Sequence, residues 1–142
     1  MPDTDPVNWQ PISQMPLIAS MIDEALDDTR DHIGTLRQTR ARPHVLDDAT
    51  IDRIERVHTE QLEFVDIYDQ QIVRWRAEKL AADHARELDR MAEQNRQLRA
   101  VTMEVLALAT ELRKGSIDRV MGMSDLELGL QALLGGRPAD RR

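Results

Sequence analysis

The chain has 142 residues, with 19 Lys and Arg residues, 26 Asp and Glu residues, no cysteine and a formal net charge of −7. The length is typical of one domain, and the absence of cysteine excludes disulfides and thiolate metal sites. Because no segment is basic, we do not expect nucleic-acid binding. No apolar run is long enough to span a membrane and the first residues are acidic, which favours a cytoplasmic protein without membrane contact.

Residues 1–15 contain three prolines, which lack a backbone donor and push the preceding residue toward extended backbone. This segment is therefore predicted to form an extended N-terminal arm. Trp9 and Ile12 are its large apolar side chains, and we expect them to hold the arm against the nearest pair of helices.

The first helix is predicted to begin near Pro16, a residue whose backbone suits the first turn, and to end before Arg42 and Pro43. Apolar side chains between Ile18 and Leu36 recur at helical spacing and share one face, whereas the acidic residues lie outside that face. The glycine at position 34 costs a helix about 1 kcal/mol relative to alanine. We expect it to mark either close packing or early fraying.

A second helix is predicted from Asp47 or Asp48, either of which can cap it, to about Leu80. Its apolar face runs from Ile51 to Trp75 without a break. About 33 residues at 1.5 Å each give a helix roughly 50 Å long.

The phase of the apolar pattern shifts at residues 81–83, where Asp83 is a candidate cap for a third helix. No glycine or proline marks this break, so a continuous helix through residues 80–85 is the alternative. From His84 to Leu112 the apolar positions alternate in spacing by four and three, which is typical of a coiled-coil seam.

Arg113, Lys114 and Gly115 predict the end of the third helix, with cations at its negative end and a glycine for left-handed backbone. A short turn at residues 116–121 follows. Residues 124–134 then combine a capping box with leucines at helical spacing, and predict a last amphipathic helix. This helix can dock on its own bundle or on a partner.

The predicted fold is all-α: an elongated antiparallel helical hairpin or coiled coil, with an N-terminal third helix and short C-terminal helices. Residues 16–136 form a single helical domain, and residues 137–142 a disordered tail. A compact chain of this length has a radius of gyration of only about 14 to 15 Å, so helices of this length imply a rod. Its apolar stripes are wide enough to favour a homodimer or higher homo-oligomer.

The residues expected at an oligomer or partner interface are the aromatic residues of the second helix, seam residues of the third and leucines of the last. The set is Phe64, Tyr68, Trp75, Leu88, Met91, Asn95, Leu98, Val105, Leu126 and Leu130. The alternative for the aromatic residues is simple core packing. For Asn95 and Thr102, control of helix register is favoured over contact with a ligand.

Glu55 and His58 form an E-x-x-H pair, one half of the motif that di-metal carboxylate bundles use twice. The second copy is missing, so His58 is expected at the edge of the core, satisfied by a neighbour. The sequence has no nucleophile elbow and no glycine-rich phosphate loop before a helix. We therefore expect no metal, no cofactor and no catalysis.

These features favour a non-enzymatic helical interaction or scaffold protein that acts through coiled-coil packing and self-association, with an unidentified protein as a further partner. The first alternative is a small acidic regulator that binds and masks a basic partner protein. The second is a di-metal carboxylate helical-bundle enzyme. A small basic patch at Arg74, Arg76 and Lys79 is interpreted as a solvated shoulder of the second helix.

Overall fold

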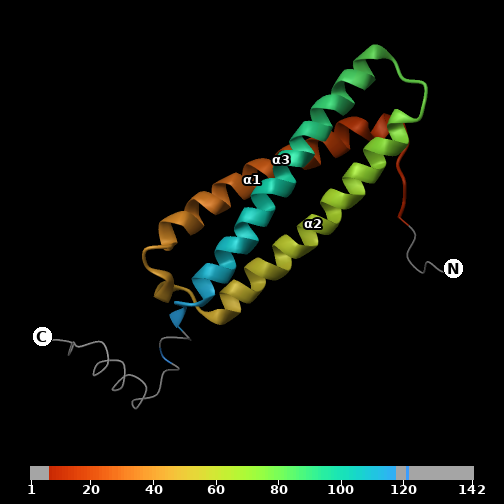
Figure 1. Cartoon of the computed structure of the whole chain (residues 1–142). Coiled ribbons are helices and arrows are strands. Elements are labelled where there is room, and N and C mark those ends of the chain that lie inside the picture. The colour runs from red at the N-terminus through yellow and green to blue at the C-terminus, as the bar shows by residue number, and fades with distance from the viewer. Residues whose placement is uncertain (1–6, 118–120, 122–142) are drawn as a thin grey trace, which may run out of the picture.

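The computed structural model describes residues 7–117 and Met121. The last helix predicted at residues 124–134 and the tail predicted at residues 137–142 therefore lie outside the described residues, as does part of the turn predicted at residues 116–121. The elements in chain order are η1 (Ile12–Gln14), α1 (Met15–Thr39), η2 (Pro43–Val45), α2 (Asp48–Arg76) and α3 (Ala82–Arg113). α1 and α2 each pack mainly on α3, which lies between them (Figure 1). The described residues form no strand, and the predicted all-α class is confirmed.

α1 begins at Met15 with a proline in its first turn, as predicted. Its apolar face is buried, and Ile22 and Leu26 have no exposed surface. The helix continues through Gly34 to Thr39, so the expected fraying at this glycine is wrong. Close packing at Gly34 is wrong as well, because a Cβ placed there meets no neighbouring atom within 4 Å in the described part of the chain. Burial of Ile33 and Leu36 in the same turns holds the helix together.

α2 begins at Asp48, and Asp47 caps it by accepting a hydrogen bond of 2.8 Å from the Thr50 amide. The helix ends at Arg76, four residues earlier than predicted. The amide of Glu78 bonds back to the carbonyl of Trp75, which closes the last turn. Residues 77–81 then connect α2 to α3, so the alternative of one continuous helix is wrong.

α3 begins at Ala82 after Ala81, whose backbone is extended. The prediction that Asp83 caps this helix is wrong: Asp83 lies within the first turn and its carboxylate pairs with Arg86. The helix ends at Arg113, as predicted.

Gly115 follows α3 for a different reason from the one predicted. Its backbone is not in the left-handed region, but a Cβ at this position would lie 2.7 Å from the Cγ of Pro43. Glycine therefore allows the chain after α3 to pass closely over the connection between α1 and α2. The connection between α1 and α2 and the chain that follows α3 therefore meet at one end of the bundle (Figure 1).

The N-terminal arm is tied to the other end of the bundle. The amide of Gln10 donates a hydrogen bond of 2.8 Å to the side chain of Gln71, and the indole of Trp75 donates one of 3.0 Å to the Gln10 carbonyl. The guanidinium of Arg74 lies 4.1 Å above the ring of Trp9, and Ile12 packs against the core. These contacts hold the arm against the end of α2.

The core joins all three long helices. Trp75, Leu88 and Leu98 have no exposed surface, and each lies among buried side chains of the other helices. No helix in the described ranges is long and apolar enough to cross a membrane.

Candidate functional site

Seven of the ten residues predicted at an interface belong to the core of a single chain: Tyr68, Trp75, Leu88, Met91, Asn95, Leu98 and Val105 are each at most 8% exposed. Phe64 is 54% exposed. Leu126 and Leu130 lie outside the described residues. Because α1 covers part of the face that we expected a second copy to cover, these seven side chains are buried without one. An interface through them stays a prediction.

Asn95 joins α3 to α2 at one register. Its Nδ2 donates hydrogen bonds of 3.0 Å to the carbonyl of Val65 and 2.7 Å to the carboxylate of Asp69. Its Oδ1 is buried and meets no donor in the part of the chain that the structure describes. Both bonds run to α2, which agrees with control of register rather than contact with a ligand.

The candidate site is a groove between α1 and α2. Because both helices pack on α3 rather than on each other, they leave a cavity of about 570 Å³ between them. We call it the α1/α2 groove. Its lining includes His32, Leu36 and Thr39 of α1, Leu46 of the connection, and Val57 and His58 of α2.

One side chain joins the three helices beside this groove. The Nε2 of Gln61 donates hydrogen bonds of 2.9 Å to the Oγ1 of Thr29 and 2.8 Å to the Oγ1 of Thr102. The two hydroxyls donate in turn to the carbonyls of Ala25 and Leu98 within their own helices. The Gln61 amide nitrogen and the two threonine hydroxyls therefore have partners within the bundle.

Two histidines face each other across the α1/α2 groove. The rings of His32 and His58 have centroids 5.1 Å apart and are tilted by 37°. The Nδ1 of His58 lies 2.7 Å from the carbonyl of Ile54, which it bonds as a donor. The pKa of His32 is lowered, first by burial and second by the neighbouring His58. Burial in the groove therefore favours the neutral form of the His32 imidazole, which packs readily against apolar groups.

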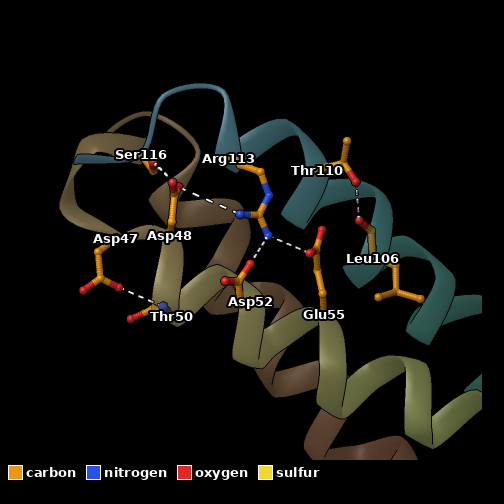
Figure 2. Close-up of polar contacts among 9 residues, drawn as sticks. All are labelled: Asp47, Asp48, Thr50, Asp52, Glu55, Leu106, Thr110, Arg113 and Ser116. Carbon is orange, nitrogen blue, oxygen red and sulfur yellow. Dashed lines mark hydrogen bonds and ion pairs between the residues drawn. The ribbon is translucent and has the colours of Figure 1, made fainter. Parts of the chain in front are cut away.

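The E-x-x-H pair does not bring its two side chains to one site. The carboxylate of Glu55 lies 2.6 Å from the guanidinium of Arg113, which also pairs with Asp52 at 2.7 Å (Figure 2). His58 instead faces His32. No group of three or more His, Asp or Glu side chains that could hold a metal occurs among residues 7–117 and 121. Glu55, which the E-x-x-H spacing suggested as a metal ligand, instead forms an ion pair that joins α2 to α3.

The charges around the α1/α2 groove differ from end to end. Arg53 lines it near the connection between α1 and α2, whereas Asp28 lines it on α1 farther from that connection. Glu24 and Asp31 are exposed on α1 in the turns around Asp28. Val57, which is 48% exposed, presents an apolar surface between these ends.

A second cavity of about 330 Å³ adjoins the N-terminal arm. Its lining includes three exposed apolar side chains: Leu17 at 56%, Met21 at 40% and Phe64 at 54%. At the same end of α2, two members of the predicted basic patch already have partners, since Arg74 stacks on Trp9 and Arg76 pairs with Asp89 at 2.9 Å.

Comparison of the chain with models of protein families, with curated proteins and with solved structures gave no match.

The groove is the feature that sequence reasoning missed. A signal was present, because His32, His58, Gln61 and Thr102 all interrupt apolar faces with polar side chains. Periodicity identifies such residues on each helix separately. It does not indicate that residues from three different helices meet.

Proposed function

We propose that this protein is a non-enzymatic helical interaction protein whose α1/α2 groove receives an amphipathic helix of a protein partner. The observation that carries this proposal is a groove that lies between two helices and combines a satisfied polar network with exposed Val57. An amphipathic helix that lays its apolar face into a groove is a recurring mode of recognition.

The length of the groove supports a helical ligand. Its lining extends from Asp28 to Thr39 on α1 and from Thr50 to Gln61 on α2. Each of these stretches covers about 16 Å of helix axis at 1.5 Å per residue, which is three turns. Two helices that flank a groove present ridges along its whole length, and a third helix can pack its side chains between them.

The charge of the partner follows from the acidic side of the groove. Asp28 lines it, and Glu24 and Asp31 are exposed on the same helix. A partner helix with Lys or Arg along one edge complements these carboxylates and is steered toward a chain of net charge −7. The acidic regulator that masks a basic partner is therefore a form of the same proposal.

A catalytic role has less support. The carboxylate of Glu55 is held by Arg113, and the Nδ1 of His58 by a backbone carbonyl. The di-metal alternative needs these two side chains to converge on one ion, and they have different neighbours.

The proposal is tested with a synthetic peptide helix that has leucines at positions i, i+4 and i+7 and lysines along one edge. Fluorescence anisotropy with the full chain should show saturable binding, weakened by about tenfold or more by Val57→Arg, which places a charge in the groove. The matched control is Met103→Arg, because Met103 is 55% exposed on α3 and does not line the groove. Absence of saturable binding, or equal loss in both variants, would reject the proposal.

Self-association is the second candidate, and the exposed cluster of Leu17, Met21 and Phe64 favours it. In this form α2 and α3 act as an antiparallel coiled coil and the cluster meets its equivalent in a second copy. Sedimentation should then give a dimer that Phe64→Glu converts to a monomer. A monomer for the natural chain at micromolar concentration would reject self-association.

A further inference from the structure

We infer that His32 and His58 together bind a divalent transition-metal ion, such as Zn²⁺, across the α1/α2 groove. A bound ion joins α1 to α2, which each pack mainly on α3. This site differs from the expectation drawn from the sequence, where the two histidines share no motif. Binding of an ion needs no protein partner, so the inference goes beyond the proposed function and does not depend on it.

His58 is only 5% exposed, yet one of its ring nitrogens is left for a ligand. Its Nδ1 donates a hydrogen bond of 2.7 Å to the carbonyl of Ile54, so the lone pair of the neutral ring is on Nε2. Nε2 has no hydrogen-bond partner in the part of the chain that the structure describes, and it is not fully enclosed, so it opens on the groove. A histidine that binds a metal through one nitrogen commonly donates the other N–H to a backbone carbonyl in this way.

His32 provides a second imidazole from the opposite wall of the groove. Its ring is half-buried, and neither of its nitrogens has a hydrogen-bond partner among the described residues. The neutral imidazole is the commonest metal ligand among protein side chains. The groove therefore holds two imidazoles, from two helices, whose nitrogens are not fully used by the bundle itself.

The spacing of the two rings suits one shared ion. An imidazole nitrogen lies about 2.0 to 2.1 Å from Zn²⁺, which places each ring centre about 3.2 Å from the ion. Two rings bound at a tetrahedral angle then have their centres about 5 Å apart. The ring centroids of His32 and His58 are 5.1 Å apart. The two helices are therefore already at the separation that one ion between these rings requires.

Two nitrogen ligands define the class of ion. Imidazole suits Zn²⁺, Ni²⁺ and Cu²⁺, whereas Mg²⁺ and Ca²⁺ prefer oxygen ligands. The described residues provide no group of three or more His, Asp or Glu side chains that could hold a metal, so water completes the coordination of this ion. Such an ion is exchangeable, in contrast to a structural zinc ion with four protein ligands.

The charges near the two rings favour a cation. Asp28 lines the same groove one turn before His32, and Asp31 is exposed on the same helix. Arg53 also lines the groove, but it lies more than one turn from His58 along α2. A chain of net charge −7 attracts divalent cations in general. Selectivity for ions that bind imidazole therefore separates this site from the field of the carboxylates.

Zinc binding by the full chain, prepared without a histidine tag, tests this inference. In isothermal titration calorimetry the natural chain should bind Zn²⁺ at a single site, and His32→Gln should weaken the binding by about tenfold or more. The matched control is His44→Gln, because His44 is exposed and does not line the groove. This control should bind Zn²⁺ as the natural chain does, and Mg²⁺ should show no saturable binding.

Three outcomes of the titration would overturn the inference. The first is the absence of saturable Zn²⁺ binding by the natural chain. The second is an equal affinity for Zn²⁺ in His32→Gln and His44→Gln. The third is an equal affinity of the natural chain for Mg²⁺ and Zn²⁺, which would assign the binding to surface carboxylates.

NMR spectroscopy of the natural chain gives a second measurement that changes no residue. Substoichiometric Cu²⁺, which is paramagnetic and binds imidazole, should broaden the ring-proton signals of His32 and His58 first. The signals of His44 and His84, which are both exposed, should broaden only at higher Cu²⁺ concentration. Equal broadening of the four histidines, or earlier broadening of the two exposed ones, would show that the ion binds at the surface and would reject the site.

Discussion

The imidazole rings of His32 and His58 face each other across the groove between α1 and α2, with their centroids 5.1 Å apart. Each ring comes from a different helix, and both of these helices pack on α3. The pKa of His32 is lowered by burial first and by the neighbouring His58 second, so a proton on His32 is unfavourable in the folded chain. The groove is therefore expected to be sensitive to acid.

Folding stability should fall as the pH drops from about 7.5 to about 5, because burial lowers the pKa of His32 in the folded chain. The unfolded chain then binds a proton at a higher pH than the folded chain, and stability rises with pH through this window. His58, Asp28 and Arg53 also line the cavity. The free energy of unfolding in urea should depend less on pH in His32→Gln than in the natural chain.

Exposed His44 provides the control, and His44→Gln should retain the natural pH dependence between these two pH values. The carboxylates of Asp23 and Glu93 have lowered pKa values, held down by Arg90 and by Gln97 and Arg96 respectively. Their contributions are lost mainly below about pH 4.5 and so lie outside the window. An unchanged slope in His32→Gln would show that this histidine is not responsible.

The two glycines in the described part of the chain, Gly34 within α1 and Gly115 just after α3, should respond oppositely to alanine. Gly34→Ala should raise the free energy of unfolding by about 0.5 to 1 kcal/mol, because the helix interior gains propensity and the added Cβ meets no neighbour. Gly115→Ala should lower it by about 1 kcal/mol or more, since the Cβ would lie 2.7 Å from Pro43. Thermal denaturation of both variants beside the natural chain measures the difference, and a shared sign would contradict the prediction.

Replacement of Asn95 should show whether its buried, unpaired Oδ1 costs more folding stability than its two hydrogen bonds contribute. Asn95→Leu should raise the free energy of unfolding by about 1 kcal/mol, because it removes a buried acceptor without a donor. Asp69 keeps its ion pair with Arg99 at 2.8 Å. Asn95→Asp should lower stability by more than about 2 kcal/mol, since it buries a charge beside Asp69. Denaturant unfolding of the two variants measures both effects, and a loss of stability in Asn95→Leu would show that the hydrogen bonds outweigh the orphaned oxygen.

Arg113 should contribute more stability than the arginines of simple surface pairs. It pairs with Asp52 and Glu55 and its side chain is 23% exposed, whereas Arg86 pairs with Asp83 and its side chain is 71% exposed. Arg113→Met should lower the free energy of unfolding by about 1 kcal/mol, while Arg86→Met should change it by less than about 0.5 kcal/mol. High salt should reduce the difference between these variants. Equal losses of stability in Arg113→Met and Arg86→Met at low salt would mean that Arg113, Asp52 and Glu55 act as independent surface charges.

Local sequence features placed most of the helical elements correctly. The apolar spacing predicted three long helices. Pro16 predicted the start of α1, Asp47 the cap of α2, and Arg113 the end of α3. Each of these features depends on interactions between residues close together in the chain, which can be inferred from the sequence alone. Both errors, the cap assigned to Asp83 and the length of α2, fall at helix boundaries. At Asp83 the carboxylate pairs with Arg86 instead of capping the helix.

The sequence by itself therefore determined that the chain is helical and which face of each helix is apolar, because both properties follow from spacing along one backbone. Only the tertiary structure decided what covers those faces. α1 packs on α3 beside α2, so seven predicted interface residues became the core of one chain. The same packing left α1 and α2 apart and brought His32 to His58. Such distances between helices depend on the fit of many side chains at once, and no single helix encodes them.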